Sequence, residues 1–570
     1  MPGKESSYTV VQLAVMDPTG DSYYRMRWPA AELAAQAPEW RVINLDARAQ
    51  ERHTWALEAD LTVLYQSSDP DLLPLIRKRK EAGKKTLVEY NDNFYEPPPA
   101  STVTKEWSSP LLWQSYERCI DAADGLIVTG PGLEELFSAR FPGKAIHVLE
   151  NHYPEPLQPF DALASAKKEH AIGWAGSLGH MADFLSVLPV LRELLREFPR
   201  ATLHVMGNDS IPSFLRLPPE RVVFTNWGSI FQYYDFWKPI SIGIAPLLDT
   251  PYNRCRSDIK AVEMAALGVT PLVAKALPYR DFCSKTECPT FGNHDELTAL
   301  LRNFLKEPAR AKELAKRCHS YVAAERIGPN SRKRLELYEK YLPAKSSTFA
   351  WPQALGYHEV IGTKAPQILS AKALQEAQTL QQAGKSSDAI GKLKETLREN
   401  PDVADVALAL TRMLFAAKSA DAPKALKENM QRFPKDLRFR LLDVSATQAA
   451  EDKQLKLESL LAALHSEPAR YRRFFRRDVT NTVCQIVKKD PSIVDAALKF
   501  ITLYPEALML RFVVAEALER CGRDAEASAQ FAVLKEAVEA KGLNEQALAE
   551  LDESYVSAWS AALKARTEGK

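Results

Sequence analysis

The sequence predicts two successive doubly wound, Rossmann-like α/β domains followed by an all-α region of helical repeats. Up to about residue 340, short apolar runs rich in Val, Ile and Leu alternate with helical patterns. Such alternation is typical of a parallel sheet covered on both faces by helices. A polar stretch with three prolines, residues 151–170, divides these runs into two sets, and after residue 345 the strand-like runs stop.

The first domain is expected over residues 1–152 and the second over 153–345. Strands of the first domain are expected at 9–15, 60–66, 85–90, 125–130 and 145–151. Strands of the second are expected at 170–176, 202–207, 221–226, 241–247 and 270–274. Ligands of such sheets bind beyond the carboxyl ends of the strands, so a cleft between the two domains is the expected site.

A linker is expected at 346–365, and helical repeats at 366–570. Prolines recur there at near-equal spacing, at Pro401, Pro434, Pro468 and Pro505. Two segments also match, because Ala389 follows Gly384 at the same distance as Ala527 follows Gly522. A glycine that ends one helix and a small alanine that lets the next pack closely are features of helix-pair solenoids, and the region resembles tetratricopeptide repeats. A generic helical bundle is the alternative.

Composition places the chain among ordinary globular proteins and excludes several partners. The 570 residues carry 74 Lys+Arg against 73 Asp+Glu, so no overall field attracts nucleic acid or an anionic membrane. No run of 18 apolar residues exists, and the N-terminus lacks the features of a signal peptide. The seven cysteines are scattered; the nearest pair, Cys283 and Cys288, is better explained as free thiols in a reducing cytoplasm than as a zinc site.

A glycine-containing turn follows the first strand of the second domain. In IGWAGSLGHMADF, the residues Gly176, Ser177 and His180 lie between a strand and a helix that begins near Asp183. Small residues at such a turn let backbone N–H groups approach a phosphate. Neither the GxGxxG fingerprint nor the GxxxxGK[ST] loop is present, so hydride transfer and ATP hydrolysis lack support.

A second cluster lies in IGIAPLLDTPYNRCRSDIKAVEMAALGVTPLVA. Arginines precede a helix that opens at Ser257-Asp258, and Lys260 and Glu263 share one helix face. Basic groups beside a helix N-terminus suit a diphosphate, and a carboxylate one turn further in suits the hydroxyls of a ribose. The alternative is an exposed Lys–Glu pair with arginines that only solubilise the loop.

These motifs together resemble the nucleotide-sugar half of family 4 glycosyltransferases, which have the GT-B fold. The resemblance is carried by GWAGSxxH, APLxDTPxNRxxSDIKxxExAALGVxPLVA and PYRDF, and in the first domain by YYRMRWPAAELA, KKTLVEYNDNFYEPP and ADGLIVTGPGLEELF; it spans about residues 8–340. It implies transfer of a sugar from a nucleoside-diphosphate donor with retention of anomeric configuration, without a required metal or further cofactor.

Carried onto this sequence, the resemblance places Glu263 on the donor ribose and Lys260 with Arg256, or Arg254, on the leaving diphosphate. The other implied donor-binding residues are Gly176, Ser177, His180, Ser257 and Asp258. Many family members carry a further glutamate where this chain has Cys255, eight positions before Glu263. Asp258 is expected to cover part of the missing role.

In the first domain, Asp92 lies just past a strand and is expected to orient an acceptor hydroxyl or act as a base; a locally satisfied turn aspartate is the alternative. Arg25 and Arg27 follow the first strand and either reach across the cleft or are surface charges. Three aromatic residues are expected in the core rather than stacked on a base or sugar: Tyr233, Tyr234 and Trp237.

Two basic segments have a structural interpretation. In RYRRFFRRD, residues 470–478, the aromatics are expected in the core and the arginines in solvent, with a nucleic-acid patch as the alternative. SRKRLELYEKYL, residues 331–342, is expected to be a packing helix where the chain crosses back to the first domain; a membrane-surface helix is the alternative.

The expected function is therefore transfer of a sugar from a nucleotide-sugar to a hydroxyl of a surface glycan, lipid-linked glycan or protein. A nucleotide-sugar epimerase of the same fold, or a non-catalytic nucleotide-binding repeat scaffold, are the alternatives. The repeats are expected to hold a protein partner, an acceptor or a second copy. The expected location is cytoplasmic, with peripheral association at the inner face of the membrane left open.

Overall fold

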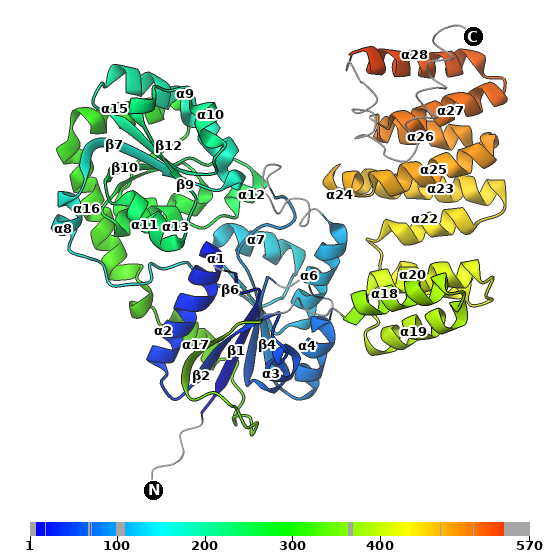
Figure 1. Cartoon of the computed structure of the whole chain (residues 1–570), viewed down its shortest axis with the longest axis horizontal. Coiled ribbons are helices and arrows are strands. Elements are labelled where there is room, and N and C mark those ends of the chain that lie inside the picture. The colour runs from blue at the N-terminus through cyan, green and yellow to red at the C-terminus, as the bar shows by residue number, and fades with distance from the viewer. Residues whose placement is uncertain are drawn as a thin grey trace. The chain divides into compact units, whose positions relative to one another are not determined.

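The computed structural model describes residues 7–17, 19–66, 69, 71–97, 109–362, 369–467, 469–505 and 507–540. The chain divides into two compact units, one that holds both sheets and one that holds the helices from Leu369 onward (Figure 1). The predicted fold class, two doubly wound parallel sheets followed by a helical region, is confirmed.

Within the described residues, the first sheet has seven parallel strands in the order β13-β2-β1-β3-β4-β5-β6. The strands are β1 (Thr9–Ala14), β2 (Arg41–Asp46), β3 (Leu61–Tyr65), β4 (Lys85–Tyr90), β5 (Gly125–Val128), β6 (Ile146–Val148) and β13 (Gly356–Val360). Its helices and helical turns are α1 (Gly20–Ser22), η1 (Tyr23–Arg27), α2 (Trp28–Gln36), α3 (Arg52–Glu58), α4 (Leu72–Glu81), α6 (Pro110–Ala122) and α7 (Pro131–Arg140).

Two strands of this sheet were not predicted from the sequence. β2 was missed, and β13 falls inside the stretch 346–365 that was expected to be a linker. In β2, buried Asn44 interrupts the apolar residues; it accepts from the amide of Gln12 in β1 and donates to the hydroxyl of Tyr357 in β13. β13 is a half-exposed edge strand, and such a strand lacks the apolar run by which buried strands are recognised.

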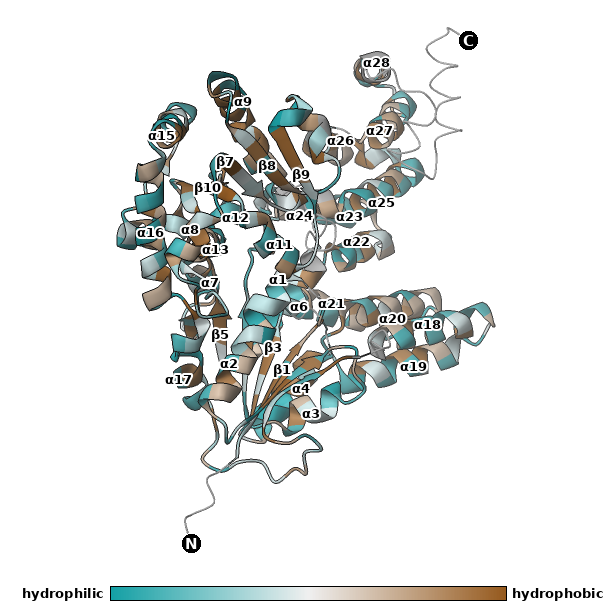
Figure 2. Cartoon of the chain, turned by 60° about the vertical axis from the view of Figure 1, so that its left-hand side comes forward, coloured by the Kyte–Doolittle hydropathy of each residue, from teal (hydrophilic) through white to brown (hydrophobic). Residues whose placement is uncertain are grey.

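Within the described residues, the second sheet has six parallel strands in the order β12-β11-β10-β7-β8-β9. They are β7 (Lys168–Ala175), β8 (Thr202–Gly207), β9 (Val222–Asn226), β10 (Ile240–Ala245), β11 (Thr270–Ala274) and β12 (Thr290–Phe291). The helical elements around them are α8 (Phe160–Ser165), η2 (Leu178–His180), α9 (Met181–Glu197), α10 (Ile211–Leu215), η3 (Pro219–Arg221), α11 (Ile230–Trp237), α12 (Pro251–Arg254), α13 (Ile259–Ala266), η4 (Leu277–Tyr279), α14 (Arg280–Thr286), α15 (His294–Lys306), α16 (Pro308–Glu325) and η5 (Gly328–Asn330). The central strands of both sheets are mainly hydrophobic (Figure 2).

The chain then returns to the first domain. After α16, helix α17 (Lys333–Glu339) places Leu335, Leu337 and Tyr338 in the core of the first sheet beside Val10. The prediction that 331–342 is a packing helix is confirmed, because its apolar face is buried and is not available to a membrane.

The second unit consists of helices that pack on their neighbours in sequence, for example α18 on α19 and α27 on α28. The helical elements are α18 (Leu369–Gln382), α19 (Ser386–Glu399), α20 (Ala404–Ala416), α21 (Ala422–Arg432), α22 (Leu437–Ala446), α23 (Ala450–Ser466), α24 (Ala469–Phe474), α25 (Arg476–Lys489), η6 (Pro491–Ile493), α26 (Val494–Leu503), α27 (Leu508–Arg520) and α28 (Asp524–Ala540). Gly384 and Gly522 both have positive φ after a helix, and Ala389 and Ala527 are buried, as expected for helix pairs. That these pairs are tetratricopeptide repeats stays a prediction.

The segment 470–478 agrees in part with its expected role. Tyr471 and Phe475 are fully buried, whereas Phe474 is exposed. Among the described residues, no helix is both long and apolar enough to cross a membrane.

Arg79, on α4, joins the end of α3 to the beginning of β4 in the first domain. Its guanidinium is fully buried and donates to the carbonyls of Ala56, Ala59 and Lys85 at 2.6–2.8 Å, the first two near the end of α3. Burial lowers its pKa to about 10. A helix end buried without such donors would leave carbonyl groups unsatisfied.

We expect Arg79→Met to lower the free energy of unfolding by about 3–5 kcal/mol, because several buried carbonyls lose their only cationic donor. Urea unfolding measures the loss. Lys80→Met, at an exposed position on the same helix, is the matched control and should change stability by less than about 0.5 kcal/mol. Equal effects of the two substitutions would contradict the assigned role of Arg79.

Candidate functional site

The candidate site lies where the carboxyl ends of the two sheets face each other. The first domain contributes η1 after β1, the loop after β4 and the start of α7 after β5. The second contributes η2 after β7 and the segment α12–α13 after β10. Hydrogen bonds cross between the domains at this place, for example from Tyr24 to Glu263 and from Arg256 to Asp92.

The turn after β7 brings the predicted phosphate loop beside helix α13. Gly176 must be a glycine, since an added Cβ would lie 2.6 Å from the ring of Trp174. Ser177 is exposed at the turn. Lys260, in the first turn of α13, donates from Nζ to the carbonyl of Ala175 at 3.1 Å, directly before this turn. The turn and Lys260, both expected at the diphosphate, therefore lie next to each other.

Two cations stand together in this cleft. Burial, together with the neighbouring charge of Arg256, lowers the pKa of Lys260 to about 8. Arg256 stacks over the ring of Tyr252 with its guanidinium carbon 4.4 Å from the ring centroid. Its Nη1 donates to Asp92 at 2.9 Å, but its buried Nε–H has no hydrogen-bond partner among the described residues. The alternative of solvent-exposed charges is wrong for this pair of side chains.

His180 and Asp183 organise the floor of the site. Burial, together with Lys260 and Arg256, holds the pKa of His180 well below its usual value, so the imidazole is neutral. Its Nδ1 lies 3.1 Å from Asp183. Asp183 also accepts from the backbone N–H of Leu248 at 2.9 Å and the amide of Asn253 at 2.8 Å, which fixes the loop before α13. Sequence reasoning placed Asp183 only at a helix start and missed this role.

Glu263 lies at the other end of the site and is buried, with 4% of its surface exposed. One carboxylate oxygen accepts from the hydroxyl of Tyr24 at 2.6 Å and the other from that of Tyr233 at 2.7 Å. Burial raises the pKa of Glu263 to about 7. An exposed Lys–Glu pair, the alternative considered for Lys260 and Glu263, is therefore excluded.

Tyr24 is a site residue that the sequence did not reveal. Its hydroxyl lies within 2.7 Å of the Tyr234 hydroxyl, so two second-domain groups contact one first-domain phenol. Tyr233 and Trp237 are buried, as expected for core aromatics, and Tyr234 is half-buried. The only available signal was a tyrosine soon after the first strand, which by itself indicates nothing about its partner.

Asp92 is buried and faces the second domain. It pairs with Arg256 and also receives a hydrogen bond from the hydroxyl of Tyr252. Burial raises its pKa to about 6, although the charge of Arg256 opposes this rise. The alternative of a turn aspartate satisfied by local backbone is wrong, because these partners come from across the cleft.

Several predicted donor-binding residues point elsewhere. Arg254 forms an exposed ion pair with Asp249 at 2.7 Å. Asp258 does not cap α13 through its side chain; it forms a bidentate pair with Arg326 at 2.6 and 2.8 Å. The hydroxyl of Ser257 accepts from the amide of Asn151 at 3.1 Å. The structure therefore does not bring Arg254 or Asp258 into the cationic cluster.

The three remaining candidates have structural partners. Arg25 is neither exposed nor aimed at the cleft, since it pairs with buried Glu89 at 2.6 Å. Arg27 pairs with Glu359 of β13 at 2.9 Å. Cys255, at the position of the missing glutamate, is buried, and burial raises the pKa of its thiol to about 12, so it supplies no charge.

The start of α7 allows the two domains to approach closely. A Cβ added at Gly132 would overlap the backbone carbonyl of Arg254, so the first domain touches the loop that carries Arg256 through a bare backbone. Only a glycine permits this contact at its observed distance. The position was not singled out from the sequence.

The cysteines of the second domain are free thiols. The buried thiol of Cys288 donates to the carbonyl of Pro271 at 3.2 Å, and Cys255, Cys283, Cys288 and Cys318 are all free. Over the part of the chain that the structure describes, no group of three or more His, Cys, Asp or Glu residues could hold a metal ion.

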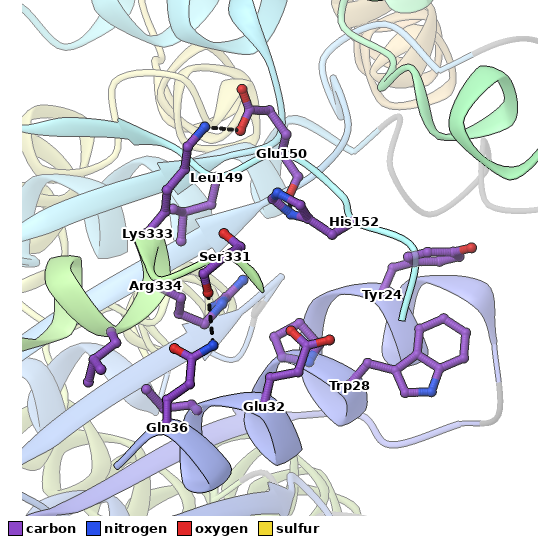
Figure 3. A pocket seen from close by; sticks show the side chains of 13 residues that line it. Tyr24, Trp28, Glu32, Gln36, Leu149, Glu150, His152, Ser331, Lys333 and Arg334 are labelled. Atoms are coloured by element: carbon purple, nitrogen blue, oxygen red, sulfur yellow. Dashed lines mark hydrogen bonds and ion pairs between the residues drawn. The ribbon is translucent and has the colours of Figure 1, made fainter. Parts of the chain in front are cut away.

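A small polar pocket of about 40 Å³ lies beside the domain connections (Figure 3). It is lined by Tyr24 of η1, by α2 from Trp28 to Gln36, and by segments that cross between the domains, including His152 and Ser331. Glu32 points into it and lies so close to Gly328 that a Cβ there would overlap its carboxylate. Burial raises the pKa of Glu32 to about 7, against the attraction of Arg334.

No protein-family model and no curated protein matches this sequence. Among solved structures, the chain is similar to TarM at a TM-score of 0.38 and 11% identity, over 49% of this chain and 54% of that one. It is similar to HepE of Anabaena in complex with UDP-glucose at 0.42 and 12%, over 58% and 100%. It is similar to a glycosyltransferase of Rickettsia africae ESF-5 at 0.43 and 13%, over 60% and 100%. The chain thus spans about half the length of TarM, and likeness of this degree decides nothing about activity.

We expect Glu32→Gln to change the free energy of unfolding more favourably at pH 8 than at pH 4.5. Because the folded-state pKa of Glu32 is raised to about 7 from 4.5, its contribution is full below pH 4.5 and is lost as pH rises through 7. The difference between the two pH values should be about 3 kcal/mol, since one pKa unit corresponds to about 1.4 kcal/mol. Urea unfolding of both proteins at each pH measures it, with exposed Glu169→Gln as control. If the stability difference between Glu32→Gln and the wild type did not change with pH, the pocket would not oppose ionisation of Glu32.

Proposed function

We propose that the cleft binds a nucleoside-diphosphate sugar and transfers its sugar to an acceptor hydroxyl. The observation that carries this proposal is the half-buried pair Arg256 and Lys260, whose N–H donors exceed the acceptors around them. The Lys260 ammonium has three donors and one hydrogen-bonded carbonyl, and the Arg256 Nε–H is unpaired among the described residues. A diphosphate supplies the missing oxygens and charge.

The groups around this pair suit the rest of such a donor. Ser177 is exposed at the turn beside Lys260, whereas Gly176 is buried and its N–H donates to the carbonyl of Met206 at 3.1 Å, so the free backbone donors of the turn begin at Ser177. Glu263 lies one helical turn beyond Lys260, and its carboxylate already accepts two hydroxyl hydrogen bonds, which is the chemistry of a ribose diol. Neutral His180 adds a polar group without adding a further charge to repel the cations.

In the proposed reaction, the bond from the anomeric carbon to the phosphate oxygen breaks, and its electron pair leaves with the diphosphate. Arg256 and Lys260 stabilise the charge that develops there. The acceptor oxygen forms the new bond to the anomeric carbon, and Asp92 takes its proton. Burial raises the pKa of Asp92 to about 6, so the carboxylate is ionised near pH 7 and still basic enough for this role.

The finer parts of the proposal follow the family 4 resemblance. They are retention of configuration, independence of a metal, a hexose as the sugar, and an acceptor on a surface glycan, lipid-linked glycan or protein. The anomeric configuration of the product, read by NMR, and activity in the presence of EDTA test the first two.

We further propose that the helical unit holds the acceptor or a partner. A groove of about 520 Å³ lies among α20–α23. Phe415, Leu426 and Met430 form its apolar part, and Lys427 and Arg440 its basic part. Such a surface suits an elongated anionic chain.

We expect Arg256→Met and Lys260→Met each to weaken binding of nucleoside diphosphates about tenfold to a hundredfold, because each removes charge-assisted hydrogen bonds. A thermal-shift screen of UDP, GDP, ADP, CDP and dTDP selects the nucleotide, and calorimetry measures Kd. Arg254→Met is the matched control, since that side chain is exposed and paired with Asp249.

The same titration has a pH signature. Because the Lys260 pKa is lowered to about 8, wild-type affinity should fall as pH rises past 8, and Lys260→Arg should remove this fall. Two results would refute the proposed donor site. One is that the wild type binds none of the five nucleotides; the other is that the wild type and both Met variants bind them with equal affinity.

We expect a chain that ends after Gly362 to hydrolyse the selected nucleotide-sugar at the full-length rate but to lose at least about tenfold in transfer to lysate glycans or proteins, because acceptor tethering raises local concentration. Radiolabel incorporation measures transfer, and released nucleotide measures hydrolysis. Unchanged transfer would remove the helical unit from acceptor binding.

A further inference from the structure

Both groups assigned to the donor are already occupied by side chains of the first domain. Tyr24 donates to Glu263, the proposed ribose carboxylate, and Asp92 accepts from Arg256, the proposed diphosphate cation. A phenol hydroxyl offers the same O–H donor as a ribose hydroxyl, and a carboxylate offers the same anionic oxygens as a phosphate. The two contacts therefore reproduce the two ends of the ligand.

Tyr24 and Tyr233 enclose the carboxylate of Glu263. Both carboxylate oxygens are hydrogen-bonded to tyrosines, the glutamate is 4% exposed, and Tyr24 is 7% exposed. A ribose diol can reach this carboxylate only when the Tyr24 hydroxyl leaves. Tyr233 comes from the same domain as Glu263, so Tyr24 is the partner that an opening of the cleft removes.

The position of Tyr24 in the fold suits such a movement. It lies in η1, a π-helical turn between α1 and α2, and π-helical turns occur frequently at functional sites. Its ring packs edge-on against Trp28 with centroids 4.8 Å apart, and Figure 3 shows both at the rim of the pocket beside α2. The Tyr24 ring thus lines the small pocket beside α2 on one side and the donor site on the other.

We propose that Tyr24 and Asp92 are built-in substitutes for the donor, which hold the empty cleft closed and are exchanged for the nucleotide when it binds. The inference rests on the proposed function. Its first consequence is that the apparent donor affinity is lower than the intrinsic affinity, because the competent open state is only partly populated.

A second consequence concerns the base. While Arg256 is bound to Asp92, the carboxylate is neutralised by its partner and does not face an acceptor. When the diphosphate takes Arg256, Asp92 is released to accept a hydroxyl proton. The exchange therefore couples arrival of the donor to the availability of the base.

The test uses full-length protein and the nucleoside diphosphate that gives the largest thermal shift among UDP, GDP, ADP, CDP and dTDP. Tyr24→Phe keeps the ring and removes the competing hydroxyl, so its Kd should fall about threefold to tenfold below the wild-type value. Tyr153→Phe is the matched control: its ring packs 5.4 Å from Tyr234 near Glu263, but no hydrogen bond to Glu263 is formed, and its Kd should be unchanged. An unchanged or raised Kd for Tyr24→Phe overturns the inference.

Thermal unfolding separates exchange from a merely structural role. Without nucleotide, Tyr24→Phe should melt below the wild type because a closing contact is lost. At saturating nucleotide the two melting temperatures should converge, since the bound state no longer contains that contact. If the difference in melting temperature persists at saturating nucleotide, the inference is overturned but the donor site is not. If neither the wild type nor the variants bind a nucleotide, the donor site and the inference are overturned together.

Discussion

The half-buried positive charge of Arg256 and Lys260 is the constraint on which the rest of the cleft depends. Removing two cations from water is costly unless oxygens surround them, and like charges at close range raise the cost. Among the described residues, only Asp92 forms an ion pair with this cluster, and Asp183 acts on it from a greater distance. Each neighbouring feature, from the neutral His180 to the carbonyl of Ala175, limits this cost without removing it.

Backbone geometry explains why the cations can stand there. Gly176 lets the strand turn directly under Trp174, and Gly132 lets the first domain touch the carbonyl of Arg254, two residues before Arg256. Arg326 joins the carbonyl of Asn151 to Asp258 at the base of α13 and so ties the connection between the domains to the helix that carries Lys260. Asp258, expected to contact the donor, thus positions the helix instead.

The sequence was sufficient to predict the fold and the second-domain residues of the site, and the reasons are physical. Apolar runs identify strands that are buried among hydrophobic neighbours, whereas Asn44 interrupts the run of β2 and β13 is a half-exposed edge strand. Lys260 and Glu263 could be paired because helical spacing is local. Tyr24 and Asp92 meet their partners across 239 and 164 residues of chain, and no local pattern encodes a contact of that separation.

Charge balance favours a diphosphate over the carboxylate that now occupies its place. Asp92 brings one negative charge to a cluster of two cations, and its own burial raises its pKa to about 6, which shows that the site stabilises its anion incompletely. A diphosphate brings more charge and more acceptor oxygens than one carboxylate can, and so reaches both Arg256 and Lys260. Because Asp92 contacts Arg256 but forms no hydrogen bond with Lys260 in the described structure, the second cation is the part of the site that only a larger anion satisfies.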